Sequence, residues 1–114
     1  MITLEQAYNI AKKSILPDGA YLVGIYEHAH LWSFEFTFAQ APGEPIIGQG
    51  IDAILKDSGS VVSVGSGAVP QFFKTNGYGK EVPPKKLRGV MTPEDYKMLV
   101  DFKELYRATG DGDE

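Results

Sequence analysis

The amino-acid sequence predicts an α+β fold: an N-terminal helix packed on a four-stranded, mostly antiparallel sheet, with an additional C-terminal helix. Apolar residues recur at helical intervals near the N-terminus and then alternate with polar residues in a stretch that begins at Tyr21. A helix-start signal, Thr92-Pro93-Glu94-Asp95, follows in the last quarter of the chain. The fold class therefore rests on patterns in three separate parts of the sequence.

The length of the chain suits one domain. With 114 residues, 43% of them hydrophobic, the chain can fill a single core and has no room for two. We expect that domain to contain four parts: a compact α+β unit over residues 1–76, a Pro/Gly-rich linker over 77–91, a helix over 92–109 and a flexible tail over 110–114.

Composition excludes several classes of function. The chain has no cysteine, which rules out a disulfide framework and a zinc site built on thiolates. The N-terminus carries neither a basic region nor an apolar run, and no stretch approaches the length of a membrane span, so we expect a cytoplasmic protein without membrane contact. A formal net charge of -4 disfavours nucleic acid as a partner; it would attract a basic protein surface or simply aid solubility. We expect no cofactor.

The first helix is predicted over residues 4–16. Thr3 and Gln6 have the spacing of a capping box, and Pro17 and Gly19 end the helical pattern. One face of this helix is apolar, made by Leu4, Ala7, Tyr8, Ala11 and Ile15.

Residues 21–39 predict an antiparallel hairpin, because aromatic residues alternate with small or polar ones along its second half. A two-residue loop at Ala29 and His30 fixes the register. The apolar pairs would then be Ile25 with Phe34, Val23 with Phe36 and Tyr21 with Phe38, and we expect Trp32 and Phe34 to anchor the core. On the other face, Tyr26 would lie across from Ser33 and Gly24 across from Glu35, which leaves a polar surface with one aromatic ring and a bare patch of backbone.

A second hairpin is predicted from residues 51–55 and 61–64, which flank a turn at 56–60 where Gly59 can adopt a positive φ. Residues 40–50 contain two prolines and three glycines and are typical of an irregular connection. Residues 68–74 favour a short helical turn, with Phe72 and Phe73 packed down.

The final helix is predicted to start at Thr92, with its hydroxyl as the cap. Its apolar stripe is wide, so it must be buried either against the other side of the sheet or against a second copy of the chain. A homodimer formed through this helix is therefore one possible assembly.

No catalytic signature stands out. His28 and His30 lie beside a predicted hairpin loop, where we expect a solvated tip, and the chain contains no further histidine or cysteine to complete a metal site. Glu35 and Asp52 would form a general acid–base pair only if neighbouring strands brought them together, whereas a carboxylate that alternates with core aromatics is ordinarily the solvated side of a sheet. We therefore predict no catalytic residues, no metal ligands and no enzymatic activity.

Several short motifs follow one another in a set order along the chain. An acidic residue precedes Ala-x-x-x-Ala at Ala7 and Ala11, the second strand carries Trp-x-Phe from Trp32, and a Gly-x-Gly pair precedes the apolar strand at Ile51. After that strand come a Lys/Asp-x-x-Gly turn that ends at Gly59, a Val-rich strand and a Gly-Ser finish through Ser66. In order and spacing these motifs resemble the immunity protein 35 (YrhB-like) family of bacterial polymorphic-toxin immunity proteins. The resemblance covers roughly residues 2–75 and leaves the C-terminal third outside it.

This resemblance implies an immunity protein that binds and neutralises a cognate bacterial toxin domain by occluding its active surface, without chemistry of its own. Binding of this kind needs aromatic anchors and complementary charges. From the hairpin register we take as the candidate partner-binding patch Tyr26, Ser33, Glu35, Thr37 and Asp52.

Two other functions remain open. A non-catalytic ligand-binding or scaffolding domain would be favoured by a deep apolar pocket with convergent polar groups. A small hydrolase or isomerase would need His28 or His30 within hydrogen-bond reach of Glu35.

Overall fold

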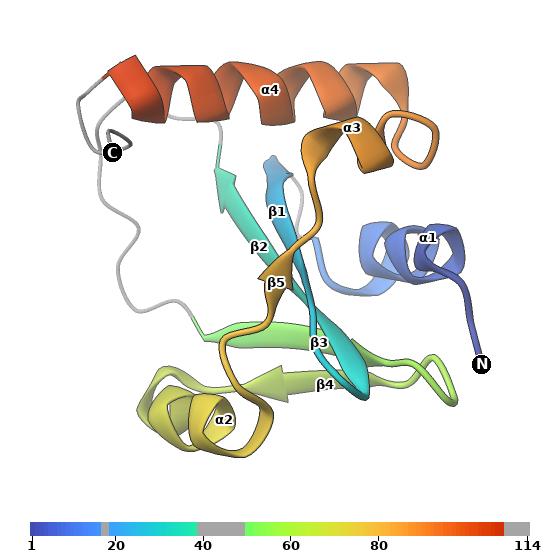
Figure 1. The fold of residues 1–114 in the computed structure, drawn as a ribbon, viewed down its shortest axis with the longest axis vertical. Coiled ribbons are helices and arrows are strands. Elements are labelled where there is room, and N and C mark those ends of the chain that lie inside the picture. Colours follow the sequence, from blue (N-terminus) through green and yellow to red (C-terminus); the bar gives the residue numbers. More distant parts are fainter. Residues whose placement is uncertain (17–18, 39–49, 109–114) are drawn as a thin grey trace.

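The computed structural model describes residues 1–16, 19–38 and 50–108, and it has the predicted α+β fold (Figure 1). The expected tail at 110–114 and all but the last residue of the expected connection at 40–50 lie outside these ranges. In chain order the elements are α1 (Leu4–Ser14), β1 (Ala20–Glu27), β2 (Leu31–Phe38), β3 (Ile51–Leu55), β4 (Val61–Val64), a 3-10 helix (Ser66–Ala68), α2 (Val69–Asn76), β5 (Lys80–Glu81), α3 (Pro84–Leu87) and α4 (Pro93–Ala108). Within the described ranges, no helix is long and apolar enough to cross a bilayer.

The described strands form one antiparallel sheet in the order β4-β3-β2-β1-β5. The sheet thus has five strands, where the sequence predicted four. The additional strand, β5, pairs with the outer edge of β1, with Glu81 opposite Tyr26 and Lys80 opposite Glu27. The segment predicted as a linker supplies both this strand and α3, and it buries Val82 and Leu87.

The hairpin of β1 and β2 has the predicted loop, closed by a 2.9 Å hydrogen bond from the His28 N–H to the Leu31 carbonyl. The pairs nearest the loop are also as predicted: Ile25 lies opposite Phe34, Tyr26 opposite Ser33 and Gly24 opposite Glu35. Beyond Gly24 the register shifts by one residue. Phe36 therefore faces Leu22 instead of Val23, and Tyr21 faces Thr37 instead of Phe38, so these two predicted pairs were wrong. A bulge at Val23 accounts for the shift, because it sets two residues of β1 against one of β2.

The helix starts follow their sequence signals. The Thr3 hydroxyl accepts from the Gln6 N–H at 3.1 Å and the Gln6 side chain accepts from the Thr3 N–H at 2.8 Å, which is the predicted capping box. Helix α1 ends at Ser14, two residues earlier than expected. At the start of α4, the Thr92 hydroxyl accepts from the Asp95 N–H at 3.2 Å.

The main core brings together α1, one face of the sheet, α3 and α4. Trp32 and Phe34 are both buried in it, as predicted. Leu99 of α4 is 1% exposed and belongs to the same cluster as Tyr8 of α1. Through Leu99 the final helix thus packs into the core that α1 also covers, rather than on the far side of the sheet.

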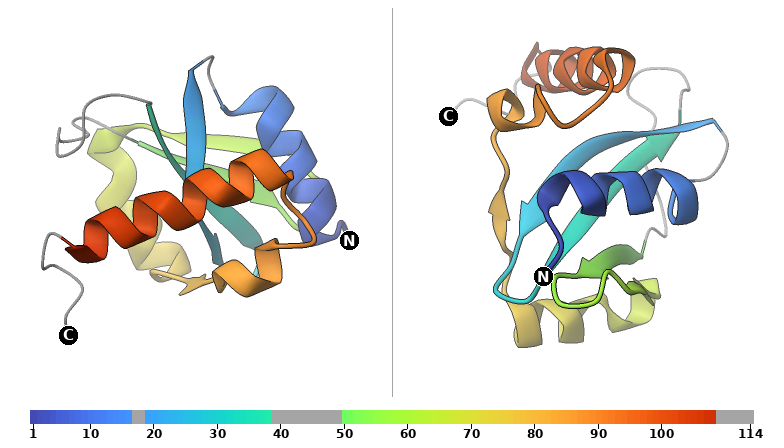
Figure 2. Two further views of the ribbon diagram at one scale, coloured as in Figure 1. Left: turned by 90° about the horizontal axis from the view of Figure 1, so that it is seen from above. Right: turned by 90° about the vertical axis from the view of Figure 1, so that its right-hand side faces the viewer.

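A smaller cluster covers the opposite face, where α2 packs over β3 and its neighbours. Its buried members are Leu31, Ala53 and Phe72. Figure 1 and the right-hand view of Figure 2 place α2 on the other side of β3 and β4 from α1. The face of the sheet that was predicted to be solvated is therefore partly covered by α2. A pocket lies at the border between the covered and the open part of this face.

Candidate functional site

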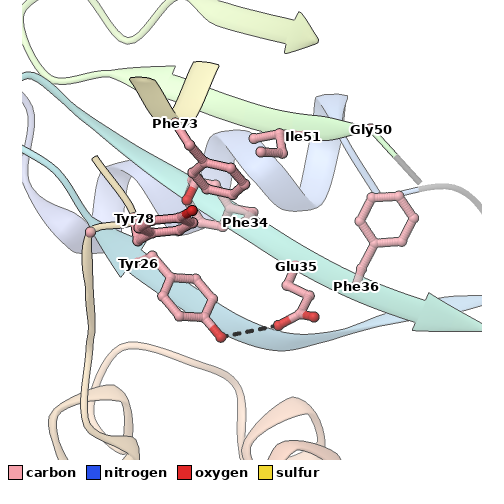
Figure 3. Close-up of a pocket in the computed structure, with 10 residues that line it drawn as sticks. Tyr26, Phe34, Glu35, Phe36, Gly50, Ile51, Phe73 and Tyr78 are labelled. Atoms are coloured by element: carbon pink, nitrogen blue, oxygen red, sulfur yellow. Dashed lines mark hydrogen bonds between the residues drawn. The ribbon is translucent and has the colours of Figure 1, made fainter. Parts of the chain in front are cut away.

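A pocket of about 460 Å³ lies where the open part of the β1–β2 face meets α2 and the chain that leads from α2 to β5 (Figure 3). Aromatic residues are numerous among the described residues that line it, and Glu35 is the one charged residue of that set. The lining residues are Tyr26, Ser33, Phe34, Glu35, Phe36, Gly50, Ile51, Phe73, Tyr78 and Gly79. The volume lies within the range of about 300–1,000 Å³ that is usual for ligand pockets.

Tyr26 and Glu35 form a polar pair across the hairpin. They come from neighbouring positions on the same face, since Tyr26 lies opposite Ser33 and Glu35 lies opposite Gly24. The Tyr26 hydroxyl donates a hydrogen bond to Glu35 Oε1 at 3.2 Å, drawn as the dashed line in Figure 3. A Cβ at Gly24 would stand 3.2 Å from both this carboxylate oxygen and the Tyr26 ring, so the glycine keeps the space that the pair occupies.

Phe73 and Tyr78 form the aromatic wall of the pocket. Their rings stack with centroids 4.6 Å apart and an angle of 28° between planes. Phe73 belongs to α2, whereas Tyr78 stands in a short turn between Gly77 and Gly79, which have φ of 76° and 79°. Most side chains avoid these φ values, so the two glycines allow the chain to turn here and project the ring outward. Tyr78 is 76% exposed.

His28 holds this turn against the sheet. Its side chain is only 5% exposed, so the expected solvated hairpin tip was wrong for His28, although His30 is exposed. His28 Nδ1 lies 3.2 Å from the Asn76 carbonyl oxygen and Nε2 lies 2.9 Å from Ser33 Oγ. Because a carbonyl only accepts, Nδ1 carries the proton, and in the neutral imidazole Nε2 then accepts from the Ser33 hydroxyl. The ring also meets the edge of Phe72, and the backbone of Gly79 lies close against it.

The structure brings together three of the five residues predicted for the partner-binding patch. Tyr26, Ser33 and Glu35 all line the pocket. The side chain of Thr37 lies outside the described part. Asp52 is not part of the group: it lies opposite Phe34, and directly opposed residues share a face, so Asp52 is on the other side of the sheet from Ser33. There its carboxylate accepts a 2.8 Å hydrogen bond from the Ser63 hydroxyl of β4.

The pairings required for catalysis are not formed among these residues. Both ring nitrogens of His28 are engaged, by Ser33 and by the Asn76 carbonyl, and Glu35 is hydrogen-bonded to Tyr26 instead. Because Glu35 and Asp52 face opposite sides of the sheet, they do not form an acid–base pair. Within the described ranges, no group of three His, Asp or Glu side chains could hold a metal ion. The arrangement suits recognition, because a carboxylate and the exposed residue Tyr78 line the same pocket.

Sequence reasoning missed Phe73 and Tyr78. Phe73 was expected to pack down with its neighbour Phe72, and only Phe72 is buried. Tyr78 fell in a segment without periodicity. The available signal was the pattern Gly-Tyr-Gly, because an aromatic residue between two turn-forming glycines is held away from any helix or strand face.

No family model, curated protein or solved structure matches the chain. The resemblance to the immunity protein 35 family therefore remains an expectation from the motifs over residues 2–75.

Proposed function

We propose that this protein is an immunity protein that binds a cognate bacterial toxin domain and blocks it by occlusion. The face that carries the pocket would be the surface that meets the toxin. The observation that carries this proposal is the exposed residue Tyr78, whose ring is stacked on Phe73 in a pocket that Glu35 also lines.

Exposed aromatic rings that are held in place by neighbouring side chains often anchor protein interfaces. Tyrosine and tryptophan contribute large contact areas at a low cost in side-chain entropy, and they are enriched among the residues that dominate binding energy. Tyr78 is held by its stack on Phe73 and by the turn that His28 supports. A ring that is already in place loses little freedom on binding, which favours affinity.

Charge supports the same proposal. The net charge of -4 gives the protein a long-range attraction for basic surfaces, and Glu35 places a negative group inside the pocket. Many toxin domains that act on nucleic acids need basic clefts to hold phosphates. Occlusion of such a cleft needs complementary shape and charge and requires no reaction by the inhibitor.

A second function is favoured by the volume of the pocket. A cavity of about 460 Å³ with aromatic walls and a few polar groups would also fit a small ligand in a non-catalytic binding domain. The two functions differ in what occupies the pocket: a side chain of a protein partner, or a free small molecule retained through purification. Native mass spectrometry of the purified protein distinguishes them, because only the second function predicts a small-molecule adduct.

The immunity function is tested by capture followed by rescue. Tagged protein is used to retain partners from a lysate of the source cells, and the captured polypeptide is then expressed alone in a heterologous bacterial host. We expect that polypeptide to stop growth, and co-expression of the immunity protein to restore it. A captured partner that is harmless, or a toxic one whose effect persists although the complex forms, would contradict the proposal.

A further inference from the structure

The pocket combines a carboxylate with stacked aromatic rings, and this combination favours a cation. Aromatic faces carry partial negative charge and attract ammonium or guanidinium groups, most strongly where water is partly excluded. Glu35 adds a full negative charge to the pocket that the stacked rings of Phe73 and Tyr78 also line (Figure 3). An anionic ligand would be repelled by this charge. A purely apolar ligand would remove water from the carboxylate without pairing it with a positive group.

The described part of the chain provides no cation for Glu35. Its salt bridges join other pairs: Lys12 with Asp95, Lys56 with Glu27, Lys97 with Asp101 and Lys103 with Glu81. Among the described residues that line the pocket, none is a lysine, an arginine or a histidine. Residues 39–49, which precede Gly50 in the sequence, also contain none of these three residue types.

We propose that the pocket receives an arginine side chain of the partner protein, whose guanidinium binds Glu35 and stacks on Tyr78. This inference rests on the proposed function, because it specifies how that partner is recognised. Arginine fits better than lysine for two reasons. Its planar fork matches a carboxylate through paired hydrogen bonds, and its flat face stacks on aromatic rings while remaining charged.

The geometry of Glu35 suits this role. Tyr26 donates to Oε1 at 3.2 Å, which fixes the orientation of the carboxylate and leaves Oε2 and the second lone pair of Oε1 for two guanidinium N–H groups. The bare backbone at Gly24 keeps the space next to this pair clear of a side chain. The volume of the pocket accommodates a long side chain together with part of its neighbours.

The inference is tested without the toxin by titrating isotope-labelled protein with acetyl-arginine amide and following its NMR signals. Acetyl-citrulline amide is the neutral isostere and serves as the probe control. We expect the arginine probe to shift the signals of Glu35, Tyr26 and Tyr78 with a dissociation constant in the millimolar range, and the citrulline probe to bind at least several-fold more weakly. The arginine affinity should also fall as salt is added.

Matched variants assign the effect to residues. Glu35→Gln keeps a group that accepts from Tyr26 and removes the charge, so it should weaken the arginine probe about three- to tenfold. Tyr78→Ala should weaken it about two- to fivefold, whereas Tyr78→Phe keeps the ring and should bind like the wild type. Glu104→Gln removes an exposed carboxylate from α4 and is the control for net charge, with no expected change.

Three results would overturn the inference: equal binding of arginine and citrulline probes, shifts confined to other parts of the protein, or unchanged affinity in Glu35→Gln while its circular dichroism spectrum shows an intact fold. These results would leave the immunity function standing if the protein still restored growth in the rescue experiment. Conversely, arginine binding without rescue would retain the pocket assignment and remove the proposed function.

Discussion

The hydroxyl of Tyr8 in α1 donates a hydrogen bond to the carboxylate of Asp95 in the first turn of α4. The Lys12 ammonium lies 2.6 Å from the same carboxylate oxygen, and the Tyr8 hydroxyl accepts from the Thr92 N–H at 3.3 Å. These contacts join two helices that are more than eighty residues apart in sequence. Burial alone would raise the pKa of the Asp95 carboxyl, but the hydrogen bonds from Lys12 and Tyr8 outweigh it and hold the pKa below its usual value.

The lowered pKa of Asp95 predicts a loss of stability in acid. In the unfolded chain the Asp95 carboxyl has its ordinary pKa of about 3.9, whereas in the folded protein it binds a proton only at lower pH. The ionised carboxylate therefore contributes its full stabilisation above the unfolded pKa. This stabilisation should disappear as the pH falls through the folded pKa. Asp95→Asn should reduce the free energy of unfolding at neutral pH by about 1–3 kcal/mol and flatten its dependence on pH below about 5.

The measurement is urea unfolding at a series of pH values, followed by the fluorescence of Trp32, the only tryptophan. Asp101→Asn is the matched control because Asp101 pairs with Lys97 on an exposed helix face. That change should cost only about 0.3–0.5 kcal/mol. Equal effects of the two variants would contradict the account of the Tyr8–Asp95 contact.

The Gly77–Gly79 turn predicts different effects for two alanine substitutions. Both glycines have a positive φ, so Gly77→Ala should cost about 1 kcal/mol in backbone strain alone, since its Cβ would meet nothing within 4 Å. Gly79→Ala adds a collision, because its Cβ would lie 2.8 Å from the His28 ring. We expect it to be the more destabilising by at least about 1 kcal/mol in urea unfolding. Similar losses for the two variants would mean that Gly79 does not pack on His28.

We expect Ser33 to stabilise the folded protein through its hydrogen bond with His28. Ser33→Ala removes the donor to Nε2 and leaves a buried acceptor unpaired, at a cost of about 1–3 kcal/mol. Ser63→Ala removes a hydroxyl that donates to Asp52 on an exposed part of β4 and should cost well under 1 kcal/mol, roughly the value of a solvated hydrogen bond. Thermal unfolding of both variants checks the difference, and a Ser33→Ala protein as stable as the wild type would contradict the buried contact.

Leu99 links α4 to the rest of the core. Leu99→Ala should destabilise the whole domain by about 2–5 kcal/mol, because it empties a fully buried site. Unfolding should remain one transition, with Trp32 fluorescence and helical circular dichroism changing together. Loss of the helical signal at lower denaturant than the tryptophan signal would show that α4 unfolds on its own.

The fold was predictable where local signals agree with the final packing. The capping box at Thr3, the alternation around Phe34 and the proline after Thr92 each specify a backbone choice within a few residues. The bulge at Val23 could not be predicted, because it depends on how β1 curves against the helices. Strand β5 was missed because Lys80 and Glu81 form a two-residue strand, too short to show periodicity.

The candidate site was predictable only in part. Tyr26 and Glu35 were placed correctly, since a two-residue loop fixes which residues share a face. Asp52 was misplaced because the pairing of β3 with β2 is set by distant chain segments, and a shift of one residue moves a side chain to the opposite face. The burial of His28 depends on contacts with Phe72 and Asn76 of α2, which lie more than forty residues away in sequence, whereas the turn that carries Tyr78 did have a local signal in Gly77 and Gly79.

The most direct test of the central claim is a comparison of toxin neutralisation by wild-type protein and by the double variant Glu35→Gln/Tyr78→Ala, with Glu104→Gln as the control. We predict that the control protects cells as well as the wild type does. The double variant should remain folded and bind the toxin at least about tenfold more weakly, a loss of roughly 1.4 kcal/mol. Full protection and unchanged affinity in the double variant would contradict the claim that the face carrying the pocket binds the toxin.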